Sequence, residues 1–169
     1  EGLEDCYLGP FQYGTDGLGA KNLIVPHGGA KNPRTEKSSI ETEDKNGNIR
    51  SLENLYMNGS EIFTFSMNSV SSSLKGVLGA AGLKKKEIDY FVFHQANKLI
   101  IDSIMRREDL PEDKLLRYYE TVGNAVSSSM PIALYEANKG GKFSHGSVII
   151  AIGFGVGYSW GGTIIRWHL

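Results

Sequence analysis

A histidine at the end of a short apolar run is the first feature of this sequence that could do chemistry. Residues 89–93, read DYFVF, have the aromatic and β-branched composition of a buried strand, and His94 follows directly. A neutral imidazole accepts a proton at one nitrogen and donates one from the other, and modest changes of environment move its pKa across neutrality. His94 is therefore a candidate catalytic group. A partly buried histidine tied to backbone groups is an equally good interpretation of the pattern.

Two other segments could supply groups to the same site. Asn124, in a Gly-Asn pair, offers an uncharged amide donor that could polarise a carbonyl oxygen, although Gly-Asn is also an ordinary turn pair. Residues 153–157, read GFGVG, would let the backbone approach a ligand and contribute N–H groups to an oxyanion hole; the alternative is a tight hairpin in a crowded core. Each segment follows a strand-like run, so a parallel arrangement would bring all three to one edge of a sheet.

The remaining reactive side chains are weaker candidates. His27 and His145 lie in glycine-containing loops, and His168 is next to the C-terminus. No pair of residues has the spacing of a metal site, and no glycine-rich phosphate loop is present, so we expect neither a metal nor a nucleotide. Residues 127–129 (SSS) favour a helix start over a nucleophile. Cys6 lies in a strand-like run and is interpreted as a structural, buried cysteine.

The spacing of apolar residues predicts the elements that would position these groups. The predicted helices span 58–81, about 97–107 and about 127–138, with a short helical piece at 111–116. The predicted strands lie around 6–8, 23–25, 89–93, 117–122, 147–152 and 160–167, and residues 14–48 read mostly as a long loop with a hairpin-type turn at Asn46-Gly47. Alternation of strands and helices favours a layered α/β domain with a central sheet.

Composition limits the class of protein. A hydrophobic fraction of 40% over 169 residues suits one domain, or one large half of a two-part protein. A net charge of −1 gives no case for nucleic acid as the main partner, and no apolar run approaches the ~20 residues that cross a bilayer. One cysteine and no signal peptide lead us to expect a cytoplasmic protein. A start without Met, with glycine concentrated near both ends, suggests an excised piece.

The ordered set of motifs resembles β-ketoacyl-acyl-carrier-protein synthase III, one of the thiolase-like condensing enzymes. The motifs are HQAN after an apolar strand, GN followed by SSSMPIAL, and GFGVGYSWGG before the last strand; YGTDGLGAKNLIVPHGGA and NGSEIF fit as well. The resemblance covers essentially the whole chain but only the C-terminal half of the enzyme. It implies that residues 1–169 form one thiolase-like half, with layered α/β architecture around a mixed five-stranded sheet.

The resemblance also implies a reaction. In that family a cysteine takes an acyl group from acyl-CoA, a malonyl group on acyl carrier protein loses CO2, and the resulting carbanion attacks the acyl-enzyme in the first condensation of fatty acid synthesis. His94 and Asn124 would be two members of a Cys-His-Asn triad. The nucleophilic cysteine belongs to the N-terminal half, so we expect this chain to be inactive alone. Acyl-CoA and malonyl carrier protein are substrates, no cofactor is implied, and the full-length enzyme is expected to be a homodimer.

Further residues receive roles from the resemblance. Phe154 corresponds to the aromatic residue beside the nucleophile, the backbone N–H of Val156 to part of the acyl oxyanion hole, and Asn97 to a residue lining the pantetheine tunnel. Docking of an acidic carrier protein would fall to the basic residues that follow HQAN. These are Lys98, Arg106 and Arg107.

Two alternatives stay open. A related thiolase-fold enzyme of specialised metabolism that condenses or transfers acyl groups would carry nearly the same motifs. A non-catalytic binding or assembly module could also keep the fold. The presence of both His94 and Asn124 argues against the second alternative, because such a module needs neither.

Overall fold

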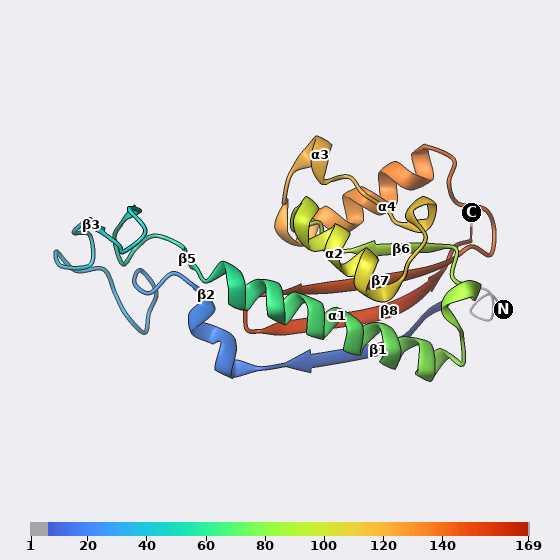
Figure 1. Ribbon diagram of the computed structural model, residues 1–169, viewed down its shortest axis with the longest axis horizontal. Coiled ribbons are helices and arrows are strands. Elements are labelled where there is room, and N and C mark those ends of the chain that lie inside the picture. Colours follow the sequence, from blue (N-terminus) through green and yellow to red (C-terminus); the bar gives the residue numbers. More distant parts are fainter. Residues whose placement is uncertain (1–6, 169) are drawn as a thin grey trace.

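A four-stranded mixed sheet forms the centre of the computed structural model, which describes residues 7–168 (Figure 1). The strands are β1 (Tyr7–Thr15), β6 (Tyr90–Phe93), β7 (Val148–Gly155) and β8 (Ser159–Arg166), in the order β1-β8-β7-β6. β6 and β7 are parallel, whereas β8 is antiparallel to both of its neighbours. Helices cover both faces of this sheet, so the predicted layered α/β architecture is confirmed.

The two faces of the sheet are buried by different helices. α1 (Gly59–Ala81) and α2 (Lys98–Glu108) pack on one face, and α4 (Ser129–Lys139) packs on the other (Figure 1). Side chains alternate along β6 accordingly: Phe91 and Phe93 join the core with α1 and α2, while Val92 joins the core with α4. Because β6 is buried on both faces, its direction is rigidly set, and so is the position of the residue that follows it.

The helix ends fall where capping residues predict them. Asn58 Oδ1 accepts a hydrogen bond from Glu61 N at the start of α1, and Gly82 ends this helix in the left-handed conformation with φ 66°. Asn97 Oδ1 accepts from Ile100 N at 2.9 Å and begins α2. The helix predicted at 127–138 is α4, two residues later at its start.

The prediction of a fifth strand at 117–122 is wrong. Leu115 forms a single parallel bridge with Phe91, and Leu116 N donates to Phe91 O at 2.9 Å, after which the chain leaves the sheet. Residues Tyr119–Val122 form the short helix α3 instead. The cause is tertiary: Gln95 Oε1 accepts a hydrogen bond from Tyr118 N at 2.9 Å and diverts the backbone at this point.

The C-terminal strands predicted at 147–152 and 160–167 are confirmed as β7 and β8, with boundaries that differ by one to three residues. β7 continues through Gly155, so the turn to β8 occupies only residues 156–158 and not the whole GFGVG segment. The N-terminal strand is longer than predicted, because β1 pairs with β8 from Tyr7↔Arg166 to Thr15↔Ser159. Cys6 lies outside the described residues. Short 3-10 turns join the elements at Gly17–Asn22, Lys85–Glu87, Glu112–Lys114 and Val126–Ser128.

An arm made of residues 16–57 extends away from the sheet (Figure 1). Two small antiparallel pairs give it order: β2 (Leu23–Ile24) with β5 (Tyr56–Met57), and β3 (Thr42–Glu43) with β4 (Ile49–Arg50). Gly47 turns the second pair with φ 80°, as its Asn-Gly sequence predicts. Among residues 7–168, no helix combines the length and the apolar character needed to cross a membrane.

Candidate active site

His94 lies at the carboxyl end of β6, beside β7. Its backbone N–H donates to Ile152 O at 3.0 Å, which extends the parallel pairing of the two strands. The imidazole meets the Phe154 ring edge-on, with ring centres 5.4 Å apart and planes at 86°. The predicted neighbours His94 and Phe154 are therefore brought together by the parallel register.

The His94 ring is held from the α4 side of the sheet. Its Nδ1 is 3.1 Å from the Oγ of Ser129, the first residue of α4, and that hydroxyl donates to Val126 O at 2.7 Å. Burial lowers the pKa of His94 below its ordinary value, and a hydrogen bond between the ring and the Val126 carbonyl partly offsets this. The neutral imidazole is thus favoured in the free protein.

Asn124 contacts Val126, the residue whose carbonyl accepts a hydrogen bond from Ser129. It is exposed, just after α3, and its Oδ1 accepts from Val126 N at 3.0 Å. Val126 itself has φ 52°, an unusual conformation for a β-branched residue. His94 and Asn124 are therefore linked by hydrogen bonds through Ser129 and Val126. The route differs from the predicted one, because Asn124 follows a helical turn and not a strand end.

The glycine-rich segment divides into a buried and an exposed part. Phe154 is 9% exposed within β7, whereas Val156 is 60% exposed in the turn to β8. On the far side of Phe154 lies Phe65 of α1, edge-on with ring centres 6.3 Å apart, and Phe65 stacks on Tyr158 at 4.0 Å. Phe65 was missed because the helical period places Phe63, not Phe65, on the buried face.

A shallow pocket adjoins this aromatic series. It has a volume of about 370 Å³ and lies between α1 and β8. Its lining residues are Asp16, Glu61, Thr64, Phe65, Asn68, Ser69, Ser72, Tyr158 and Trp160. The site thus combines a strand-end imidazole, a nearby amide and apolar rings, which suits an uncharged acyl or thioester group better than a phosphate.

Gln95 is a second residue that sequence reasoning missed. Its side chain is fully buried; Nε2 donates to Phe93 O at 2.7 Å and to Leu116 O at 3.3 Å, and Oε1 accepts from Tyr118 N. These bonds tie the end of β6 to the segment that leads into α3 and Asn124. The sequence shows only a Gln between His94 and a helix start, and this pattern does not predict a buried side chain that bonds to two other segments.

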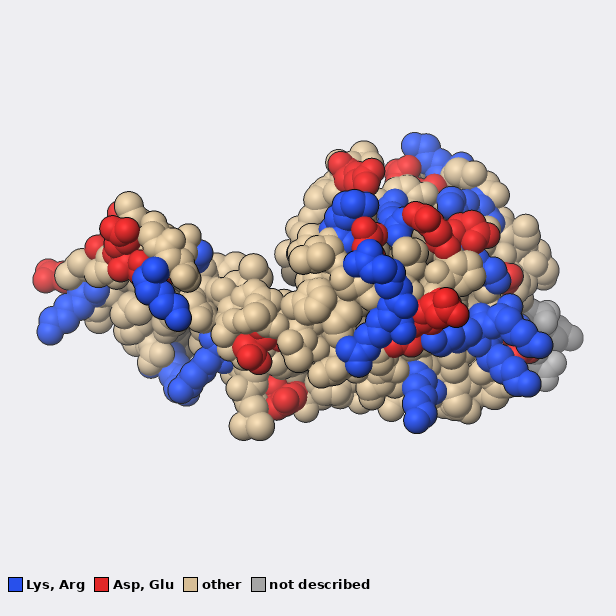
Figure 2. Space-filling model, viewed as in Figure 1, with Lys and Arg blue, Asp and Glu red and all other residues tan. Residues whose placement is uncertain are grey.

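The residues after HQAN form a partly neutralised basic surface. Asn97 is exposed at the start of α2, and Lys98 pairs with Asp102 at 3.1 Å. Arg106 and Arg107 are exposed and donate to neutral oxygens, those of Ser103 and Asn68 respectively. Figure 2 shows Lys and Arg side chains over α2 and the adjoining part of α1, with acidic residues between them.

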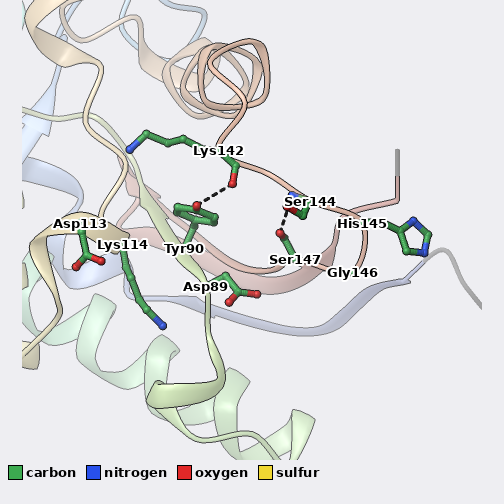
Figure 3. Close-up of a pocket in the computed structure, with 9 residues that line it drawn as sticks. All are labelled: Asp89, Tyr90, Asp113, Lys114, Lys142, Ser144, His145, Gly146 and Ser147. Atoms are coloured by element: carbon green, nitrogen blue, oxygen red, sulfur yellow. Dashed lines mark hydrogen bonds between the residues drawn. The ribbon is translucent and has the colours of Figure 1, made fainter.

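A second pocket lies at the opposite end of β6 and contains none of the principal candidates (Figure 3). Two of its charged groups are engaged with the backbone: Lys114 Nζ donates to Ile88 O at 2.6 Å, and Asp89 Oδ2 accepts from Val148 N at 2.8 Å. Figure 3 shows the His145 ring turned away from the other lining residues, and this ring packs against His168. Exposed His27 lies in the arm. These three histidines are not part of the His94 site.

Metal ligands are not clustered in the described part of the chain. Within residues 7–168, no group of three or more His, Cys, Asp or Glu side chains could hold a metal ion. The candidate site is built from side chains and backbone groups of β6 and of the segment between α3 and α4. Its polar contacts are His94, Asn124, Ser129 and the Val126 backbone.

Comparison with known proteins gives one consistent family. The family described as 3-oxoacyl-[acyl-carrier-protein (ACP)] synthase III C terminal matches residues 78–167. Among curated relatives, β-ketoacyl-[acyl-carrier-protein] synthase III of Caldanaerobacter subterraneus is 36% identical over 98% of this chain and 46% of its own length. The chloroplastic synthase III B of Cuphea wrightii is 34% identical over 97% of this chain and 41% of its own.

Solved structures agree with this. A crystal structure of a 3-oxoacyl-(acyl-carrier-protein) synthase III superposes with a TM-score of 0.92 at 42% identity, over 95% of this chain and 48% of that one. The enzyme from Thermus thermophilus gives a TM-score of 0.79 at 30% identity, over 97% of this chain and 47% of that one. The chain spans about half the length of the relatives that it matches.

Proposed function

Because the chain belongs to the 3-oxoacyl-[acyl-carrier-protein] synthase III family, we propose that it is the C-terminal half of a decarboxylating condensing enzyme. The complete enzyme would join an acyl group from acyl-CoA to malonyl-acyl carrier protein and so start fatty acid synthesis. The observation that carries the proposal is the placement of His94 and Asn124 around Val126 at the carboxyl end of the parallel strands.

The proposed chemistry places developing charge between these two residues. When the malonyl thioester loses CO2, the electron pair of the broken C–C bond moves onto the thioester oxygen as an enolate. Hydrogen bonds from His94 and from the amide nitrogen of Asn124 would stabilise that oxygen. The enolate carbon then attacks the acyl thioester on a cysteine, forms the new C–C bond and expels the thiolate.

The other site residues have supporting roles in this proposal. Phe154 would keep water away from the reacting carbons, since it is almost fully buried beside His94. The exposed turn that contains Val156 would offer its backbone N–H to the oxygen of the acyl thioester. Asn97, exposed at the start of α2, would line the passage for the pantetheine arm.

The basic surface on α2 would receive the carrier protein. Arg106 and Arg107 donate to neutral oxygens and are exposed, with Arg107 also near the Glu108 carboxylate, whereas Lys98 forms an ion pair with Asp102. An acidic carrier protein is attracted by such a surface mainly through faster association, which salt weakens. We therefore assign more of the docking to the two arginines than to Lys98.

The nucleophile and part of the site would come from an N-terminal half. Support comes from exposed apolar side chains on β1 and the arm, which include Leu8, Phe11, Tyr13, Leu18 and Leu55. An apolar surface of this extent favours burial against another protein segment. The same surface would contribute to a homodimer of the full-length enzyme.

Transfer of a labelled acetyl group from acetyl-CoA tests the proposal that the nucleophilic cysteine lies in the N-terminal half and not in this chain. The full-length polypeptide that contains this chain should acquire label on a cysteine, and the 169-residue chain by itself should acquire none. Label on Cys6 of the isolated chain would contradict the proposal, because it would place the nucleophile within this half.

A further inference from the structure

Tyr158, two residues after Val156, is held by the base of the arm at residues 16–22. Its backbone exchanges two hydrogen bonds with Asp16: Asp16 N donates to Tyr158 O at 2.9 Å, and Tyr158 N donates to Asp16 O at 2.7 Å. The Tyr158 hydroxyl accepts from Asn22 Nδ2 at 2.8 Å. These contacts fix one end of the turn 156–158 that joins β7 to β8.

Packing leaves the Tyr158 ring little room to move. Tyr158 is only 6% exposed, and its ring stacks on Phe65 of α1 with ring centres 4.0 Å apart and planes at 11°. Gly19 also lies against the ring: a methyl group on Gly19 would come within 2.1 Å of Tyr158 Cε2. A side chain at position 19 would therefore displace the ring, and glycine is the residue that fits.

Asn22 is itself held in place by a contact that does not involve Tyr158. It ends the 3-10 turn Gly17–Asn22 directly before β2, and its backbone carbonyl accepts from Asn58 N at 2.8 Å. Asn58 is the residue that caps α1, so the Asn22 backbone is tied to the start of this helix. The Asn22 amide thus reaches the Tyr158 hydroxyl from a fixed position.

We infer that Asn22 is a positioning residue for the turn 156–158 and, through this turn, for the backbone N–H of Val156. The inference rests on the proposed function only for the use of that N–H as a donor to the oxygen of the acyl thioester. The Val156 side chain is 60% exposed, so the turn takes its position from its two ends, Phe154 in β7 and Tyr158.

The expected consequence is limited to one half of the reaction. An oxyanion donor is effective only when it is held where the negative charge develops, so a loosened turn should slow transfer of the acyl group to the cysteine. Release of CO2 from the malonyl group depends, in the proposed function, on His94 and Asn124. This second step should therefore be insensitive to Asn22.

Hydrogen exchange tests the positioning without reference to activity. In the full-length polypeptide, the backbone N–H groups of residues 156–160 should exchange at least ~3-fold faster in Asn22→Ala than in the wild-type protein. Tyr158→Phe removes the same hydrogen bond from the other side and should give the same increase, and the double variant should add nothing further. Asn32→Ala is the matched control, because the Asn32 amide also donates to a backbone carbonyl within the arm, that of Pro26. It should leave exchange at 156–160 unchanged.

Separate measurement of the two half-reactions tests the consequence for catalysis. Asn22→Ala should lower the maximal rate of cysteine acetylation at least ~10-fold, while the acetyl-CoA concentration that gives half this rate changes less than ~2-fold. Its CO2 release from malonyl carrier protein should stay within ~2-fold of the wild-type rate. Gly19→Ala should behave like Asn22→Ala, since its methyl group displaces the Tyr158 ring. Gly17→Ala is its control, because a methyl group there meets no atom within 4 Å.

Two results would overturn the inference. One is unchanged exchange at residues 156–160 in Asn22→Ala. The other is faster exchange throughout the chain with equal loss of both half-reactions, because Asn22 would then support the fold as a whole. If exchange rises only at the turn but acetylation keeps its wild-type rate, or the wild-type polypeptide acetylates no cysteine, the proposed function fails at that step and the positioning role of Asn22 stands.

Discussion

Nδ1 of His94 lies 3.1 Å from Oγ of Ser129, so the residue after β6 and the first residue of α4 meet at one point across the edge of the sheet. Val126 completes this meeting point, since its carbonyl accepts from Ser129 and its N–H donates to Asn124. The candidate site therefore depends on how the segment between α3 and α4 is held against β6.

Gln95→Glu should destabilise the protein by at least about 3 kcal/mol, because one carboxylate oxygen would replace an amide that donates to the carbonyls of Phe93 and Leu116. Urea unfolding measures the loss. Asn97→Asp is the control: it makes the same chemical change two residues away, at an exposed helix start where Asp caps as well as Asn. Equal stability of the two variants would rule out the proposed role of Gln95.

Arg117→Ala should cost about 1–3 kcal/mol. Arg117 pairs with Asp102 at 3.0 Å and with Glu112 at 2.7 Å. Because Asp102 is largely buried, removal of the Arg117 guanidinium leaves the Asp102 carboxylate short of a partner. Lys98→Ala removes another partner of Asp102 but one that is mostly exposed, and should change stability by less than about 1 kcal/mol. Thermal unfolding of both variants checks the order, and the reverse order would contradict it.

Val126→Asn should stabilise the fold by about 1 kcal/mol. Val126 is mostly exposed with φ 52°, and Asn tolerates this conformation whereas a β-branched side chain does not. The backbone bonds to Asn124 and Ser129 are kept. Val122→Asn, at a partly exposed position where φ is not positive, is the control and should bring no gain. A loss of stability in Val126→Asn would mean that the Val126 side chain itself contributes contacts.

The titration of His94 should weaken the fold in mild acid. Burial lowers its pKa in the folded state, so the unfolded state takes up a proton more readily once the pH falls through about 6.5. Stability linked to His94 is therefore complete above that pH and declines below it, until the lowered folded pKa is reached. His94→Asn should flatten this dependence in urea unfolding between pH 5 and 7. An unchanged slope would show that the ring titrates normally.

Local patterns were sufficient wherever a segment has one favoured structure. Asn97 and Gly82 cap their helices as the sequence predicts, and the buried run before His94 is the strand β6. The pattern failed at residues 117–122. Their aromatic residues favour a strand, but contacts with Gln95 and Asp102 hold the start of this segment away from the sheet. Asp102 lies 15 residues before Arg117 and Gln95 lies 23 residues before Tyr118, and no periodicity in the sequence predicts such contacts.

The candidate site, too, could be predicted from the sequence only in part. His94 and Phe154 could be paired from the sequence, because the carboxyl ends of adjacent parallel strands meet at one edge of the sheet. Ser129 could not, since it is the last of three consecutive serines at the start of α4 and only their packing distinguishes the buried hydroxyl from the exposed ones. The link through Val126 depends on a positive φ at a residue type that disfavours it, which sequence patterns do not predict.

Release of CO2 from malonyl-acyl carrier protein by the full-length polypeptide tests the central claim most directly. We predict that His94→Ala lowers this rate by about 10²-fold or more and that Asn124→Ala lowers it substantially, because each removes a donor to the enolate oxygen. His27→Ala, in the arm and away from the site, should keep the wild-type rate. An unchanged rate of decarboxylation in His94→Ala would contradict the assignment of this histidine as the catalytic group of the chain.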